Sequence, residues 1–384
     1  MTSQRIHPDG LLSGVRIVDL TRLLPGPLAT QQLADLGADV LKIEERHGDP
    51  ARHMSPPAGN SLAFQMVNRH KRFATLDLKQ EPDRRRLLAL AAEADALVES
   101  FRPGTLGRLG LGWETLHAAN PRLVLCSISG YGQDGPYAQY AGHDINYLAL
   151  AGVLHPIAQS GGVPVVPNLP LSDVLGAQAA ATGIVAALLH ARVHGTGVHL
   201  DVALADAALS ANPLALAAAN AGREIEPPGQ GLLNGGAPCY GLYPCSDGLY
   251  VAVGALEAKF WRTLAEGLGL PELAAQHWSQ GLKPGSAASH AIRSTVAERF
   301  AGATRDEWLA RLEPLDCCVT PVLRQAEALA HPLFRARCAA GAFPVPGGAE
   351  RLWAAPAQRV AGHAFAPRRE AQSIGCDDPP GWPA

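Results

Sequence analysis

The run Val15-Arg-Ile-Val-Asp-Leu20 decides the fold class, because of the pattern that follows it. The run is short, apolar and rich in β-branched residues, which is typical of a buried strand. Leu23-Leu-Pro-Gly-Pro27 then turns the chain into an apolar helix over residues 28–36, and residues 39–44 predict a second strand. A strand, a helix and a second strand within roughly thirty residues indicate a βαβ unit of parallel sheet.

The same alternation continues through the first third of the chain. Further strands are predicted at 73–78, 96–99 and 123–129, and helices at 82–94 and near 113–118. Strands that alternate with helices predict an α/β fold, with a large Rossmann-like parallel-sheet domain covered by helices on both faces. Ligands of such sheets bind at the carboxyl ends of the strands.

The second half of the chain has a different pattern. Residues 212–236 are Ala-rich and then rich in Pro and Gly, which predicts a linker. Beyond it, strands at 240–243 and 249–253 form a predicted hairpin, and amphipathic helices follow. The sequence therefore predicts a large α/β domain over 1–211, the linker over 212–236, a small α+β domain over 237–317 and a return segment over 318–384 that completes the large domain.

Composition restricts the partners and the compartment. A net charge of −3 with 17% charged residues argues against nucleic acid or an anionic membrane surface as the main partner. The most apolar run, residues 174–189, is rich in Ala and Gly and predicts a buried helix, so no membrane partner is expected. Residues 1–10 are polar and do not resemble a secretory signal, and the seven cysteines show no pairing pattern. We therefore expect a cytoplasmic protein with reduced thiols.

The stretch from residue 142 to residue 173 holds His143, Asp144 and Asp173 in a mostly apolar setting. Histidine is the natural base near neutral pH. Asp173 follows Ser172, which we interpret as the N-cap of a helix, and a carboxylate in a first helical turn is stabilised as the anion. A single Asp at such a position is most often only a helix-start residue. The alternative is a reactive centre formed with His143 and Asp144.

The loop Gly130-Tyr-Gly-Gln-Asp-Gly135 matches the letters of a dinucleotide-binding fingerprint. It follows the fifth strand instead of the first, and Pro136 to Tyr140 is a poor helix start, so we do not expect a nicotinamide site. The loop favours a close approach of backbone to a ligand. Ile128, Ser129 and Gly130 are therefore candidate substrate contacts.

Two groups of basic residues suggest phosphate recognition. The run from Arg69 to Arg72 is most often a solvated loop, with phosphate binding as the alternative. Arg102 and Arg108 bracket a turn in a loop at the ligand-binding edge of the sheet, which favours a polyphosphate ligand. His190 and His194 have the spacing of a helical metal pair, but no third ligand lies nearby in the sequence, so we expect no metal.

These motifs resemble the family III CoA-transferases and, within that superfamily, the α-methylacyl-CoA racemases. The resemblance covers nearly the whole chain. The shared runs are Gly14–Leu20, Pro25–Pro27, Leu33–Ala38, Lys71-Arg72, Leu76–Lys79, Phe101–Gly104, Gly130–Gly132 and Gly135-Pro136. The resemblance implies CoA contacts by Arg46, Lys71, Arg72, Ser100, Phe101, Arg102 and Arg108, although Glu45 stands where many members have an arginine. It also implies an interlocked homodimer with an active site shared between the two chains.

Three further places resemble the racemases in particular. Gly142-His-Asp-Ile-Asn-Tyr147 is similar to the racemase motif with its catalytic histidine, and Val253–Glu257 to the segment with the glutamate that partners it. Asn234–Tyr240 resembles the racemase segment at a place where the transferases have a run of glycines. Asp173 stands where racemases keep a second base and transferases a nucleophile, so it does not discriminate. In the implied dimer, Glu257 would meet His143 from the partner chain.

The resemblance implies a racemase that inverts the carbon next to the thioester of a 2-methylacyl-CoA, without a cofactor, because CoA is part of the substrate. His143, oriented by Glu257, and Asp173 are the expected bases, while Asp144 and Tyr147 are expected to contact the substrate. The amides of Asp144 and Asp173 are the expected donors to the thioester oxygen. Asp173 must be neutral when it donates a proton, so we expect a raised pKa.

Two other functions remain open at this point. In CoA transfer, Asp173 would attack the thioester as a nucleophile and a carboxylic acid would accept the CoA. A CoA-binding or scaffolding protein would explain the CoA motifs, but not the combination of His143, Asp173 and Glu257.

Overall fold

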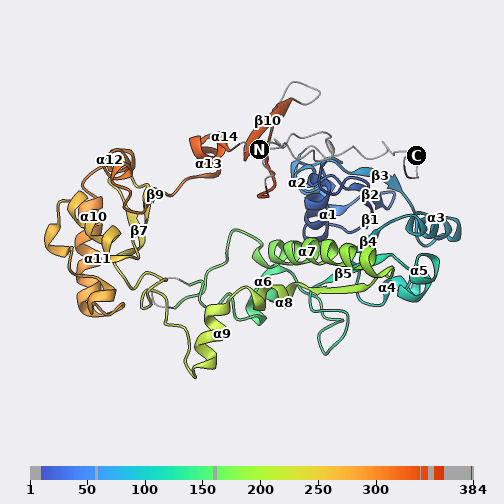
Figure 1. The fold of residues 1–384 in the computed structure, drawn as a ribbon, viewed down its shortest axis with the longest axis horizontal. Coiled ribbons are helices and arrows are strands. Elements are labelled where there is room, and N and C mark those ends of the chain that lie inside the picture. The colour runs from blue at the N-terminus through green and yellow to red at the C-terminus, as the bar shows by residue number, and fades with distance from the viewer. Residues whose placement is uncertain are drawn as a thin grey trace. The chain divides into compact units, whose positions relative to one another are not determined.

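The computed structural model describes residues 10–56, 59–158, 162–337, 339–344 and 350–358, together with Trp382. The chain forms two compact units, which are coloured along the chain in Figure 1. The large unit comprises Met1–Val153, Pro167–Ala211 and His331–Ala384, and the small unit comprises Leu154–Val166 and Asn212–Ala330.

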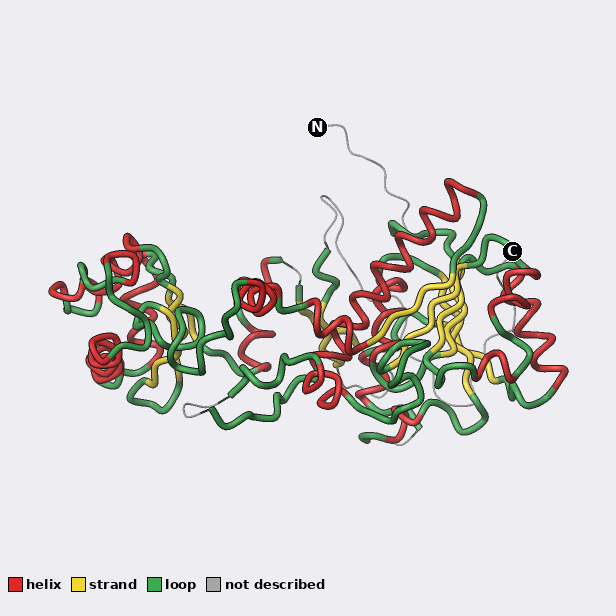
Figure 2. The backbone as a smooth tube through the Cα atoms, turned by 90° about the horizontal axis from the view of Figure 1, so that it is seen from below, coloured by secondary structure: helices red, strands yellow, loops and turns green. Residues whose placement is uncertain are grey.

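Six parallel strands form the sheet of the large unit, in the order β3-β2-β1-β4-β5-β6. Strands are drawn in yellow in Figure 2. The predicted α/β class is therefore confirmed. The strand order reverses between β1 and β4, which is the place where open α/β sheets bind ligands. The strands are β1 Arg16–Leu20, β2 Asp39–Glu44, β3 Arg72–Thr75, β4 Ala96–Glu99, β5 Val124–Ser129 and β6 His199–Ala203.

Apolar cores cover both faces of this sheet. Successive side chains of a strand point to opposite faces, so Ile17 and Val18 of β1 belong to different cores. Each buried side chain of this size stabilises the fold by about 1.5–3 kcal/mol. The helices on the first face are α1 Pro25–Asp35 and α7 Leu171–His194, and those on the second are α3 Glu81–Ala92 and α5 Trp113–Ala119.

Helix α7 is 24 residues long and packs through small side chains. Ala177, Ala180 and Ile184 are fully buried in the core of the large unit. A Cβ at Gly176 would lie 2.1 Å from Leu204 Cδ2. The glycine therefore allows the first residue of helix α8, Leu204–Ser210, to pack closely against α7. By length and composition α7 could cross a membrane, but its buried face is part of the core, as predicted for this run.

The start of α7 corrects one prediction. Ser172 is not the N-cap, because the Val174 N–H already donates to Pro170 O in an i to i−4 bond and the helix begins at Leu171. The Ser172 hydroxyl instead donates to Leu204 O at 2.9 Å, and its side chain is buried. Ser172 therefore joins α7 to α8, and Asp173 remains in the first helical turn.

The small unit has its own antiparallel sheet, in the order β7-β8-β9. Its core contains Trp261, Tyr243, Phe300 and Trp308, and both indoles donate to backbone carbonyl groups at 2.8 Å. The predicted hairpin and the helices after it are present. The elements are β7 Tyr240–Pro244, β8 Tyr250–Gly254, β9 Val319–Pro321, α10 Ala258–Gly267, α11 Ala287–Phe300, α12 Arg305–Leu312 and α13 Gln325–Ala330.

Strand β9 corrects the predicted boundary after residue 317. β9 pairs with β8, from Val253↔Val319 to Val251↔Pro321, so it completes the small sheet and does not return to the large unit. The return begins at His331 and continues into helix α14 Pro332–Ala336 and the hairpin β10 Ala340–Pro344 and β11 Glu350–Ala354. Apart from Trp382, the predicted return segment beyond residue 358 lies outside the described residues.

Several elements were not predicted from the sequence. Strand β6 alternates polar and apolar residues at the sheet edge, and helix α9, Pro213–Asn220, occupies part of the predicted linker. The segment Leu154–Val166 belongs to the small unit although it precedes α7. The remaining short helices are η1 Pro50–His53, α2 Leu62–Met66, α4 Thr105–Arg108, α6 Asp144–Leu150, η2 Pro271–Leu273, η3 Trp278–Gln280 and η4 Glu313–Leu315.

Candidate active site

The first part of the candidate site lies where β5 ends and helices α6 and α7 begin. All three elements belong to the large unit, and α6 contacts α7. Their ends bring together residues that are far apart in the sequence. The Asp173 N–H donates to Asp144 Oδ1 at 3.0 Å, across a separation of 29 residues.

His143 stands at the N-cap of α6 and is exposed. Its backbone N–H donates to Asn146 Oδ1 at 3.0 Å, which fixes the start of the helix. Its charge acts on the carboxylate of Asp173, so the three predicted residues His143, Asp144 and Asp173 form one cluster.

The electrostatics of the cluster make Asp173 easier to protonate than an ordinary aspartate. Burial and, to a smaller extent, the neighbouring Asp144 carboxylate raise the pKa of Asp173 to about 6, while the charge of His143 acts in the opposite direction. Among the described residues the Asp173 carboxylate accepts no hydrogen bond, since only its N–H is engaged. The direction of this shift agrees with the expectation from the sequence. A carboxyl group with such a pKa exchanges protons readily near neutral pH.

Tyr147 braces the loop between β5 and α6. Its hydroxyl donates to Gly142 O, and its ring lies edge-on to Tyr131 at 5.0 Å between centroids. Cβ atoms at Gly130 and Gly142 would lie 2.5 Å and 2.8 Å from the Tyr147 ring, so both positions require glycine. Tyr147 was predicted to contact the substrate, but its buried hydroxyl serves this internal bond.

The other predicted substrate contacts divide into two groups. The Ile128 side chain is buried in the core of the large unit, so its side chain does not face a substrate. Ser129 ends β5, and its buried Oγ has no hydrogen-bond partner in the described part of the chain. Ser129 is therefore a candidate donor to a ligand, and Gly130 follows it directly.

The two predicted oxyanion donors, the backbone N–H groups of Asp144 and Asp173, differ in whether they already donate a hydrogen bond. The Asp173 amide is occupied by Asp144 Oδ1, so it is not free to bind a thioester oxygen. Asp144 is the first residue of α6, and its N–H has no carbonyl partner within that helix. The Asp144 amide therefore remains available as a donor, and the Asp173 amide does not.

Glu257, the third predicted catalytic residue, lies in the small unit. It is the N-cap of α10, is exposed, and makes no side-chain capping bond. Its carboxylate raises the pKa of the thiol of Cys318, in addition to the larger effect of burial.

A second region of the large unit lies at the carboxyl ends of β1, β2, β3 and β4. It is a cavity of about 490 Å³ lined by residues that directly follow these strands. They include Thr21 and Arg22 after β1, Glu45 and His47 after β2, Leu76 and Lys79 after β3, and Phe101 and Thr105 after β4. This is the ligand-binding edge that the fold predicts.

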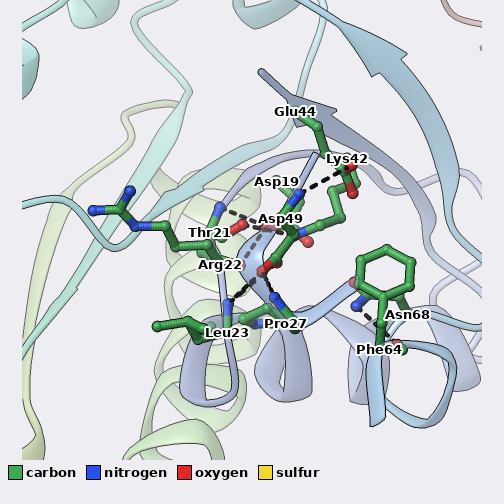
Figure 3. Close-up of polar contacts among 12 residues, drawn as sticks. Asp19, Thr21, Arg22, Leu23, Pro27, Lys42, Glu44, Asp49, Phe64 and Asn68 are labelled. Atoms are coloured by element: carbon green, nitrogen blue, oxygen red, sulfur yellow. Dashed lines mark hydrogen bonds and ion pairs between the residues drawn. The ribbon is translucent and has the colours of Figure 1, made fainter. Parts of the chain in front are cut away.

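The wall of this cavity rests on a buried network of charges, shown in Figure 3. Asp19 accepts hydrogen bonds from Thr21 and Thr30 and pairs with Lys71 Nζ at 3.0 Å. Burial alone would raise the pKa of Asp19, but Lys71, Lys42 and the two hydroxyl groups lower it to about 2.

Asp49 extends this network to the loop after β1. Lys42 Nζ lies 3.2 Å from Asp49 Oδ2 and donates to Thr21 O at 2.6 Å. The Asp49 carboxylate accepts from the N–H of Leu23, which has a left-handed φ of 66° (Figure 3). These bonds hold the loop in a conformation that is unfavourable for leucine.

The structure corrects two of the predicted CoA contacts. Lys71 is fully buried, and its Nζ is bound by Asp19, Pro27 O and Asn68 Oδ1, so it cannot reach a phosphate. Arg72 begins β3 at the amino end of the sheet and pairs with Asp39 at 2.9 Å. It therefore lies at the edge opposite to the ligand-binding edge.

The remaining CoA predictions fall at or near the carboxyl edge. Phe101 lines the cavity, and Ser100 Oγ accepts the N–H of Arg22 at 3.2 Å. Arg46 lies between two lining residues and is exposed, and Arg102 is exposed directly after Phe101. Arg108 donates to Thr105 Oγ1 at 2.8 Å and lines a neighbouring cavity together with three other basic residues, Lys79, Arg84 and Arg85.

Sequence reasoning missed three basic residues of the cavity, Arg22, His47 and Lys79. Each directly follows a predicted strand by one to three residues, and that position is the signal that could have identified them.

Comparisons with known proteins give the family. A model of CoA-transferase family III matches residues 12–371. The chain belongs to this family. The α-methylacyl-CoA racemase of Mus musculus is 38% identical over 334 residues, covering 85% of this chain and 81% of the racemase. The succinyl-CoA–L-malate CoA-transferase alpha subunit of Chloroflexus aurantiacus is 33% identical over 332 residues, covering 85% and 77%.

A solved structure agrees over nearly the full length of this family III protein. The crystal structure of a CaiB/BaiF family protein from Brucella suis matches with a TM-score of 0.82 and 29% identity, covering 95% of this chain and 97% of the other. The chain is therefore an enzyme of the family III CoA-transferase and racemase type. Both activities occur among its similar relatives.

Proposed function

We propose that this family III enzyme is a racemase that inverts the α-carbon of a 2-methylacyl-CoA thioester. The observation that carries the proposal is the cluster of exposed His143 with Asp173, whose pKa is raised to about 6. Racemisation by two bases needs one group that accepts the α-proton and another that already holds a proton. The carboxyl group of raised pKa can hold that proton near neutral pH, and the neighbouring histidine is the second base.

The proposed reaction moves one proton off the α-carbon and returns one to its opposite side. One base takes the α-proton, and the electron pair of the C–H bond moves into an enolate with its charge on the thioester oxygen. The conjugate acid of the other base then protonates the carbon. His143 and Asp173 exchange these tasks between the two enantiomers, and Glu257 is proposed to orient His143.

The enolate oxygen requires hydrogen-bond donors, because no side chain removes an α-proton without stabilisation of the charge that develops. The N–H of Asp144 and the unpartnered Oγ of Ser129 support this role. The Asp173 amide is excluded from it, because Asp144 Oδ1 already accepts its proton.

The CoA moiety is proposed to occupy the cavity at the ends of β1 to β4. Phe101 provides an aromatic ring for the adenine base, and Arg22 and Lys79 provide positive charge around the same space. The neighbouring basic cavity at Arg84 and Arg108 suits a phosphate group. No separate cofactor is proposed, and a homodimer with a shared active site remains part of the proposal.

The deciding experiment is incubation of the purified protein with one enantiomer of a 2-methylacyl-CoA in heavy water, without any acceptor acid. We expect deuterium at the α-carbon, measured by NMR, together with loss of optical purity, measured by chiral chromatography. His143→Ala and Asp173→Asn are expected to abolish inversion.

The alternative function, CoA transfer, predicts a different result in the same assay. Its support is the transferase relative and the unbonded carboxylate of Asp173, which could act as a nucleophile. It predicts no α-exchange, movement of CoA only after a carboxylic acid is added, and a covalent adduct at Asp173 detectable by intact mass. That outcome would overturn the racemase proposal.

A further inference from the structure

The small unit contains a cavity of about 890 Å³, and none of the residues assigned to the proposed reaction lines it. All of its lining residues belong to Leu154–Val166 or Asn212–Ala330, so the cavity is formed within this unit. Much of the lining is apolar, with Leu233, Leu242 and Val253 among its residues. Its basic side chains are Arg293 and His290, one turn apart on α11, and none of the described lining residues is an Asp or a Glu.

Contacts with Tyr243 and Leu242 of strand β7 fix the position of the Arg293 guanidinium. Its guanidinium lies over the ring of Tyr243, 5.0 Å from the centroid, and its Nη2 donates to Leu242 O at 3.3 Å. A Cβ at position 241 would lie 2.2 Å from Arg293 Nη1, so Gly241 is what allows the guanidinium to lie against strand β7. Holding a guanidinium in this way reduces the entropy that is lost when it binds a ligand.

Within the described part of the chain, the charge of Arg293 has no counter-ion. No carboxylate of the described residues forms an ion pair with it, and its Nη1 is buried without a hydrogen-bond partner. A guanidinium carries five donors, and a half-buried one without an anion is unfavourable. The facing loop is fixed to the same helix, because Ser289 Oγ donates to Gly236 O at 2.7 Å.

We propose that this cavity binds a carboxylate carried on an apolar chain, with Arg293 as the residue that recognises the carboxylate. The charge and the N–H donors of the guanidinium suit a carboxylate, and the apolar lining suits the chain. The carboxylate could belong to a free acid or to the far end of an acyl-CoA. Only the acyl-CoA source rests on the proposed function.

Equilibrium binding tests the proposal without any turnover. The dissociation constant of hexanoate is measured by calorimetry with the full chain and compared with that of hexanamide, which has the same shape and no charge. For a free acid, we expect hexanoate to bind at least about tenfold more tightly. Arg293→Gln is expected to remove this difference, and Arg262→Gln, on the exposed surface of α10, is expected to retain it.

The second source is tested in the same way with 2-methyladipoyl-CoA and its neutral counterpart 2-methylhexanoyl-CoA. A preference for the carboxylate-bearing thioester that depends on Arg293 assigns the site to the acyl chain, and a hexanoate preference assigns it to a free acid. If neither preference depends on Arg293, the proposal is wrong, whether or not the protein racemises any thioester. Gly241→Ala is the second variant, because it displaces the guanidinium without removing it and is expected to weaken binding similarly.

Discussion

The network around Asp19 and the cluster around Asp173 lie at the carboxyl end of the same sheet, but their charges are arranged in opposite ways. Asp19 is fully buried, accepts hydrogen bonds on both oxygens, and faces two lysines, so its pKa falls to about 2. Asp173 is half-buried, its carboxylate accepts no described hydrogen bond, and its charged neighbour on α6 is another carboxylate. Its pKa rises to about 6.

This difference separates the structural role of Asp19 from the catalytic role proposed for Asp173. A buried carboxylate with every lone pair satisfied is fixed in one protonation state across the physiological range and holds the backbone in place. A carboxylate that burial and a like charge make reluctant to ionise can change its state during a reaction. Burial is the largest single influence on both carboxylates and raises both pKa values, so the sign of the neighbouring charges decides the direction of the net shift.

The largest expected effect is loss of stability when the Asp19 network is broken. Lys71→Met removes the Nζ that pairs with Asp19 and leaves a buried carboxylate without its partner. We expect a loss of about 3–5 kcal/mol in the free energy of unfolding, measured by urea titration at pH 7.

The matched control for that variant is Arg85→Met, which breaks the exposed pair between Arg85 and Glu81 on α3. Because those side chains are 71% and 67% exposed, we expect a change within about 0.5 kcal/mol. Equal stability of the two variants would mean that the buried network does not hold the loops of the cavity.

The second effect is loss of activity at Asp173 without loss of stability. Asp173→Asn removes one of the two proposed bases, and we expect racemisation to fall by at least about a thousandfold. The ionised carboxylate opposes folding above pH 6, because its pKa is about 6 in the folded state and 3.8 in the unfolded reference.

The unfolding free energy of Asp173→Asn should therefore equal or exceed that of the wild type at pH 7.5, and the difference should vanish as pH falls below 3.8. Asp206→Asn, at an exposed position of α8, serves as the control and should retain activity. A strongly destabilised Asp173→Asn would place Asp173 with Asp19 among the structural carboxylates.

The sequence predicted the strands and helices that have clear apolar periodicity. β1, β2, β4 and β5 were found within one residue of their ends. Strand β6 was missed because His199 and Asp201 alternate with apolar residues at an exposed edge. The residues of β9 fell in the predicted return segment and were assigned to the wrong unit, because the pairing of β9 with β8 depends on a contact across more than sixty residues.

Only part of the candidate site was predicted, because local motifs are visible in the sequence and contacts between distant residues are not. His143, Asp144 and Asp173 were recognised through local motifs, and the structure brings them into one cluster. Lys71 was mistaken for a phosphate ligand because a run of basic residues does not reveal whether one of them is buried. Its partner Asp19 lies 52 residues away, and only the packed sheet brings the two together.

The third effect is the pH dependence of the proposed racemisation. The active enzyme needs one proton shared between His143 and Asp173, so protonation of both groups should inactivate it. We expect kcat/KM to fall about tenfold per pH unit below the pKa of Asp173, about 6, for both enantiomers alike. A rate that stays constant down to pH 5 would show that Asp173 is not the group that titrates.

The smallest effect is a change in that profile when Asp144 loses its charge. Asp144→Asn keeps an oxygen that can accept the Asp173 N–H, but it removes the like charge that raises the pKa of Asp173. We expect the acid limb of kcat/KM to move to lower pH, with less than about 1 kcal/mol change in unfolding free energy. Complete loss of activity at every pH would instead make Asp144 a direct participant in catalysis.

Lys42→Met is the corresponding change in the Asp19 network. It should raise the pKa of Asp19, because the charge that it removes is positive, whereas Asp144→Asn removes a negative charge.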